Sequence, residues 1–220
     1  MMKRNVCIIL LLVAGIIVLF ATSLIVGSVR IPLADVCDIL FDKFDGKESW
    51  KYIIMENRLP QALTAMLCGA SLAVCGLMLQ TAFRNPLAGP DVFGISSGAG
   101  LGVAIVMLFL GGSVSTTMFT VSGFLAILTS AFIGAIVVTM IILLLSTMVR
   151  NSVLLLIVGL MVGYVSSSAV ALLNFFASGE GVKSYIVWGM GNFGGVSMNH
   201  MQLFALLCLV GIIASIFLIK

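Results

Sequence analysis

The chain has 220 residues, of which 61% are hydrophobic and 9% are charged. A typical soluble domain is about 25% charged, so this chain has too little charge to cover a surface in contact with water. Its formal net charge of +3 is too small for the basic surface that nucleic-acid binding requires. These values exclude a soluble enzyme, a disordered chain and a nucleic-acid-binding protein, and they predict an all-α, polytopic membrane protein.

Six apolar stretches are long enough to cross a bilayer, which takes about 20 residues in a helix. They are continuous rather than alternating, which favours helices over a transmembrane barrel. We expect one transmembrane domain over residues 1–220. Its spans are predicted at Val6–Val29, at Gln61–Phe83, at Val92–Leu110, within Thr117–Met148, at Leu154–Ala177 and at Met201–Ile219.

The first apolar stretch begins like a signal peptide, because Lys3 and Arg4 precede it. Its apolar core is longer than that of a signal peptide, so we predict an uncleaved helix. The basic residues of the whole chain divide almost evenly between the two sides of the membrane, and the positive-inside rule alone does not decide the orientation. We place the N-terminus in the cytoplasm because Lys3 and Arg4 flank the first span closely.

Residues 30–60 then form an extracytoplasmic loop, the only sizeable segment outside the membrane. Pro32 can open a short amphipathic helix in this loop. The apolar stripe expected for it consists of Leu33, Val36, Leu40 and Phe44. Such a helix would lie on the membrane surface, either as an ordinary linker or as an element that binds a partner.

The six apolar cores contain no Asp, Glu, Lys, Arg or His. Intramembrane acids and bases mark ion paths and proton relays, so their absence counts against a secondary carrier, which remains an alternative. His200 is the only histidine, no residues have metal-ligand spacing, and the five scattered cysteines form no disulfide framework. The stretch Gly179–Ser184 lacks the adjacent Gly-Lys of a phosphate-binding loop. We therefore predict no catalytic site, no cofactor and no metal in this chain.

Small residues recur at every fourth position in two spans. One row is Gly94, Gly98 and Gly102, and the other is Gly159, Gly163, Ser167 and Ala171. Such rows let helices approach closely in lipid, so close packing is the first interpretation of both. The fifth span also carries a group of polar residues that makes it the candidate to line a pathway, namely Ser166, Ser167, Ser168 and Asn174.

Several motifs resemble the FecCD-type permeases, the membrane subunits of ABC importers for iron–siderophore complexes, haem and cobalamin. The resemblance covers residues from about 6 to 220 and rests on Arg58-Leu59-Pro60, on Gly69–Ala73 with Gly76, on Arg84–Pro90, on Gly94–Ala99, on Trp188–Gly191 and on Phe193–Val196. The residues that match its central motif are Gln80, Asn85, Pro86, Gly94 and Gly98.

The resemblance implies a multi-pass protein of the bacterial inner or plasma membrane, in contact with lipid. It implies three protein partners: a second permease subunit in a homodimer or heterodimer, cytoplasmic ABC ATPase subunits, and an extracytoplasmic substrate-binding protein. It also implies that the fifth helix lines the pathway, that Asn151 and Ser152 lie at the cytoplasmic gate, and that Arg58 docks the binding protein. An iron–siderophore-type chelate is the expected cargo because it is the commonest in the family, with cobalamin and haem as alternatives.

Two departures from the family pattern bear on function. A second docking arginine is expected three residues after Arg58, but Gln61 stands there. Members of the family have about ten spans, whereas six are predicted here, and the missing part includes the loop that couples to the ATPase. The chain is therefore expected to be the N-terminal portion of a permease, with a non-transporting truncated fragment or half of a split permease as the alternative.

Overall fold

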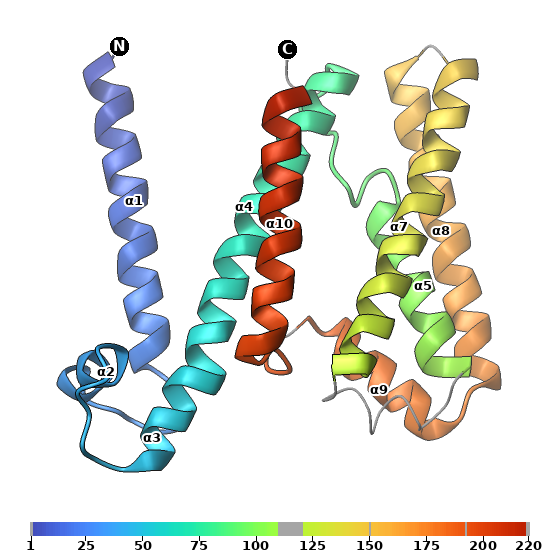
Figure 1. Cartoon of the computed structure of the whole chain (residues 1–220). Helices are drawn as coiled ribbons and strands as arrows, with labels where there is room; N and C mark the ends of the chain where they lie inside the picture. Colours follow the sequence, from blue (N-terminus) through green and yellow to red (C-terminus); the bar gives the residue numbers. More distant parts are fainter. Residues whose placement is uncertain (1, 110–120, 150, 192, 219–220) are drawn as a thin grey trace. The chain divides into compact units, whose positions relative to one another are not determined.

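The computed structural model describes residues 2–109, 121–149, 151–191 and 193–218, which consist of helices and connecting turns without a strand. The all-α prediction is confirmed. The elements, drawn in Figure 1, are α1 (Met2–Ile25), α2 (Leu33–Leu40), α3 (Glu48–Tyr52), the π-helix η1 (Ile53–Arg58), α4 (Leu59–Phe83), α5 (Ile95–Ala104), the π-helix η2 (Ile105–Phe109), α7 (Val121–Met148), α8 (Ser152–Phe176), α9 (Gly179–Gly189) and α10 (Met198–Leu218).

Within the part of the chain that the structure describes, five helical stretches have the length and apolar character needed to cross a membrane. They are Arg4–Ile25, Glu48–Phe83, Gly123–Met148, Val153–Phe176 and Met198–Leu218. The remaining apolar helix, Ile95–Leu108, is shorter. Five of the six predicted spans therefore correspond to a membrane-length helix.

The third predicted span differs most from the structure. It was expected to start at Val92, but Val92 and Phe93 lie in a turn and the helix begins at Ile95. Gly94 has a left-handed backbone with φ of +71°, which ends the turn and starts the helix in a new direction. The other predicted limits Leu110, 117–120 and Ile219 lie outside the described residues.

The chain folds as two compact units. Residues 1–69 and 196–214 form unit 1, and residues 70–195 and 215–220 form unit 2. Each unit has its own buried apolar cluster, and each is described by itself below.

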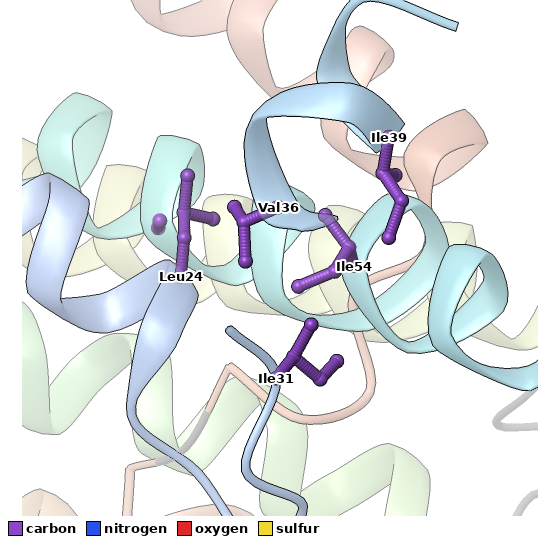
Figure 2. Packing of buried hydrophobic residues seen from close by; sticks show 6 residues of the cluster. Leu24, Ile31, Val36, Ile39 and Ile54 are labelled. Atoms are coloured by element: carbon purple, nitrogen blue, oxygen red, sulfur yellow. The ribbon is translucent and has the colours of Figure 1, made fainter. Parts of the chain in front are cut away.

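The core of unit 1 lies where α1, α2 and η1 meet. Its buried residues are Leu24, Ile31, Val36, Ile39, Ile54 and Ala62, and Figure 2 shows their side chains close together. Helix α2 turns Val36 and Ile39 into this core, whereas Leu33 and Leu40 are exposed. The buried face therefore differs from the stripe expected from the sequence, because α2 packs against both the last turn of α1 and η1.

In unit 2, α5 packs closely against both α7 and α8 through its glycines. A Cβ atom added at Gly98 would lie 2.8 Å from the carbonyl oxygen of Gly134 on α7, and one at Gly94 would lie 2.9 Å from that of Gly159 on α8. The backbones can approach so closely only because these positions carry no side chain. At these contacts the glycine rows serve helix packing.

We expect Gly94→Ala to destabilise unit 2 by about 2–4 kcal/mol, because the left-handed backbone disfavours a side chain and the added Cβ overlaps α8. Gly76→Ala on α4 is the matched control, since a Cβ there meets nothing within 4 Å and alanine favours the helix by about 1 kcal/mol. Denaturant unfolding in detergent, followed by circular dichroism, measures both. Equal stability of the two variants would contradict the packing role of Gly94.

Candidate functional site

The turn that follows α4 carries most of the central motif. Arg84, at φ of +47°, ends the helix in the left-handed conformation. Its amide donates to the carbonyl of Thr81 at 3.3 Å, and the amide of Asn85 donates to the carbonyl of Gln80 at 3.1 Å. This pair of bonds is a Schellman motif, which satisfies carbonyls that the end of a helix leaves free. Gln80 contributes to the turn through its backbone, and its side chain is exposed.

Asn85 then folds the chain back toward α5. Its side-chain oxygen accepts a hydrogen bond from the amide of Leu87 at 2.9 Å, as in other Asx turns. Pro86 follows, where the fixed φ of proline suits a tight turn. The returning chain buries Phe93 completely, and its ring lies 4.4 Å from that of Phe83, centroid to centroid. The motif residues therefore shape a turn and a helix contact within unit 2.

The four predicted pathway residues of α8 divide between two faces. Ser166 is buried, donates to the carbonyl of Val162 at 3.0 Å, and lines an apolar recess of about 430 Å³ between α5, α7 and α8. Ser167 and Ser168 are exposed on the other side of the helix. Asn174 is half-buried, and its side-chain oxygen has no hydrogen-bond partner among the described residues.

Tyr164 belongs with the exposed polar group, although sequence reasoning missed it. It precedes Ser167 and Ser168 by three and four residues, a spacing that places side chains on one face of a helix, and it is 65% exposed. Ala171 continues this face and is exposed as well. These residues form a polar stripe along an otherwise apolar, membrane-length helix. We call it the α8 stripe, and it consists of Tyr164, Ser167, Ser168 and Asn174.

The predicted gate residues lie at the start of α8. Asn151 is the N-cap, and its side-chain oxygen accepts from the amides of Val153 at 2.9 Å and Leu154 at 3.3 Å. Ser152 is the first residue of the helix, and position 150 lies outside the described residues. The cap satisfies amides that the helix start leaves free, so Asn151 fixes where α8 begins.

Arg58, the predicted docking residue, is buried in unit 1. Its guanidinium donates to the carbonyls of Leu24 at 2.7 Å and Ile25 at 2.9 Å, and also to that of Val29. These carbonyls lie at and just beyond the C-terminal end of α1, where the helix dipole favours a positive charge. In this arrangement Arg58 holds the end of α1 against η1, and its side chain does not face solvent. Gln61, in place of the second arginine, donates to the side chain of Asn57 at 2.8 Å.

Helix α9 was not predicted from the sequence. Its signal is local: Ser178 caps it by accepting from the amide of Gly181 at 3.3 Å, and Gly191 follows its end with φ of +69°. Tyr185 of α9 donates to the carbonyl of Gly100 on α5 at 3.4 Å, and burial raises the pKa of its hydroxyl. Among the described residues, no three His, Cys, Asp or Glu side chains come together to hold a metal ion.

Comparison with known proteins extends the motif observations to nearly the whole chain. The sequence pattern of the FecCD transport family matches residues 15–220. The vitamin B12 import system permease protein BtuC of Serratia proteamaculans is 33% identical over 195 residues, which cover 88% of this chain and 53% of that protein. A Helicobacter pylori protein named "Probable iron chelatin transport system permease protein" is 35% identical over 171 residues, which cover 72% of this chain and 48% of that protein.

The fold also matches a solved structure, an inward-facing structure assigned to the metal-chelate type of ABC transporters. The TM-score is 0.71 at 24% identity, with 92% of this chain and 59% of that chain covered. The chain spans about half the length of the curated relatives that it matches.

We expect Arg58→Gln to lower the free energy of unfolding of unit 1 by about 2–4 kcal/mol, because it removes charged hydrogen bonds from the carbonyls at the end of α1. Arg58→Lys, which keeps the charge, should recover part of this loss. Arg30→Gln, at an exposed arginine, is the matched control. Denaturant unfolding in detergent followed by tryptophan fluorescence measures the effect, since Trp50 packs on this core. Equal loss in the Arg30 control would contradict the capping role.

Proposed function

Because this chain belongs to the FecCD transport family, we propose that it serves as permease in an ABC importer that passes an iron–siderophore-type chelate across the bacterial membrane. The observation that carries the proposal is the family match over residues 15–220, supported by five membrane-length helices among the described residues. The chain is a multi-pass membrane protein and a transport component without a catalytic site of its own. ATP hydrolysis belongs to separate subunits.

The α8 stripe is the proposed lining of the pathway. A bare hydroxyl or amide facing lipid loses hydrogen bonds that water would supply, so an exposed polar stripe on a membrane helix suits a water-filled passage or a neighbouring helix. Ser167, Ser168 and Asn174 are assigned to the lining. Ser166 faces the recess within unit 2 and is assigned to its packing. The turn at Asn151 and Ser152 is the proposed cytoplasmic gate, whose position depends on the Asn151 cap.

Three protein partners complete the proposed importer. They are a second permease subunit across the pathway, a pair of cytoplasmic ATPase subunits, and an extracytoplasmic binding protein that delivers the cargo. Arg58 contributes to the docking surface by positioning residues 25–29, because its guanidinium donates to the carbonyls of Ile25 and Val29 at the two ends of this segment. The additional docking charge that Gln61 does not supply would have to come from the exposed basic residues of the same loop, such as Arg30 and Lys43.

Cobalamin is the second candidate cargo. It is favoured by the vitamin B12 permeases among the relatives, including that of Serratia proteamaculans, whereas the Helicobacter pylori relative is named for iron chelatin. Both cargoes are bulky chelates.

Deleting the gene for this chain should abolish uptake of a radiolabelled iron–siderophore complex, and restoring the gene should recover it. Testing the same cells with labelled cobalamin and haem identifies the cargo. Loss of cobalamin uptake alone would mean that the cargo is cobalamin rather than an iron–siderophore complex. Uptake that persists after ATP depletion would indicate a secondary carrier instead. Unchanged uptake of all three compounds in the deletion strain would refute the importer proposal.

Cysteine labelling tests the α8 stripe. In a chain whose five native cysteines are replaced by alanine, Ser167→Cys should react with a membrane-impermeant thiol reagent, because water at the stripe allows the thiol to ionise. Val165→Cys is the matched control: it lies two residues away, is 71% exposed, and falls on a different face of α8. Equal protection of both cysteines would place the stripe against another helix or lipid and remove it from the pathway.

A further inference from the structure

Helix α2 has an apolar face that the core of unit 1 does not use. Leu33 is 58% exposed, Leu40 40% and Phe41, directly after the helix, 75%. Cys37 is exposed as well. Leu33, Cys37 and Phe41 are four residues apart, and Leu40 lies three residues after Cys37, spacings that place side chains on one side of a helix. We call these four positions the open face of α2. The face that carries Val36 and Ile39 is buried, and Asp35 and Asp38 occupy the remaining side.

The depth of α2 follows from its contact with α1. The membrane-length stretch of α1 has 22 residues, Arg4–Ile25, and at about 1.5 Å per residue it is just long enough for a hydrocarbon layer of about 30 Å. Leu24 therefore lies near the boundary of that layer. Val36 and Leu24 belong to the same buried cluster, and Figure 2 shows them adjacent. Helix α2 consequently lies at the level where hydrocarbon gives way to headgroups.

The direction of α2 suits this position. Figure 1 shows α2 running across the axis of α1 rather than along it, beside the C-terminal end of α1. The sequence restricts it in the same way, since only residues 26–32 connect the two helices. A short helix that crosses the end of a transmembrane helix lies close to the membrane plane.

We propose that α2 is an in-plane anchor whose open face, formed by Leu33, Cys37, Leu40 and Phe41, contacts lipid at the membrane interface. The proposal requires only that α1 spans the bilayer and does not depend on transport activity. Asp35 and Asp38 then point toward water and headgroups. Lipid contact fixes the depth of α2, and through the shared core it fixes the depth of the Arg58 cap at the end of α1.

Lipid is favoured over a soluble partner by the chemistry of the surroundings. The open face has no charged side chain, whereas basic and aromatic residues typical of the interface follow it in the chain. Lys47 lies over the ring of Trp50, 5.4 Å from its centroid, and Tyr52 is 66% exposed. A soluble binding protein that comes and goes would leave this apolar face in water between encounters, which is unfavourable. Lipid covers it at all times.

Site-directed spin labelling of the native Cys37 tests the anchor with a probe on the open face itself. The other four cysteines are replaced by alanine, and the full chain is reconstituted into vesicles of phosphatidylcholine with phosphatidylglycerol. Collision of the label with oxygen, which concentrates in lipid, is compared with collision with a water-soluble nickel chelate. The matched control carries Cys37→Ala and Asp38→Cys, which moves the label one residue onto the acidic side of α2.

We expect the ratio of oxygen to nickel-chelate collisions to be several-fold higher at position 37 than at position 38. A ratio at position 37 as low as at position 38 would mean that the open face lies in water, and would overturn the proposal. A label at position 37 that neither reagent reaches would mean that protein covers the face, and would overturn it equally. Equal thermal unfolding of the two labelled chains shows that both have kept the fold.

Discussion

Hydrocarbon offers no hydrogen bonds, and every backbone amide and carbonyl within it must therefore be satisfied by the protein. This constraint explains why the described residues are helical and why the helix ends of this chain are so specifically built. The Arg58 guanidinium donates hydrogen bonds to carbonyls at the end of α1. A Schellman pair of hydrogen bonds ends α4, and the Asn151 side chain caps the start of α8. Each device lies where a membrane-length helix meets a turn, which is where the helix alone leaves polar groups free.

The same constraint governs how helices meet. Lipid removes the hydrophobic driving force between transmembrane helices, so close contact of backbones becomes the main source of attraction. In unit 2, Gly98 and Gly134 bring α5 against α7, and Gly94 and Gly159 bring the start of α5 against α8. Phe93 fills the space beside these contacts and is fully buried. The motif that marks the family is, in this unit, a way of turning the chain between α4 and α5 and of seating α5 between its neighbours.

The proposed functional surfaces are the helix faces that this packing leaves exposed. On α8, Gly159, Gly163 and Ser166 face the neighbouring helices, and Tyr164, Ser167 and Ser168 remain exposed. The packing face and the proposed pathway face of one helix are thus determined together. On α2, burial of Val36 and Ile39 leaves the acidic side and the open face, each suited to a different surrounding. In both helices, the surface available to a ligand or to lipid is the surface that is not buried in the core.

The amino-acid sequence by itself determined the all-α class, the five membrane-length helices found among the described residues, and the family, because long apolar runs and a dense local motif act over short distances along the chain. Tertiary structure alone decided which face of each helix is buried. Leu33 and Val36 were indistinguishable as apolar positions, and only contact with Leu24 and Ile54 buried one and left the other open. Arg58 was predicted to face a partner, yet α1, more than thirty residues earlier, supplied the carbonyls that enclose it. Such contacts join residues distant in sequence, and no local pattern records them.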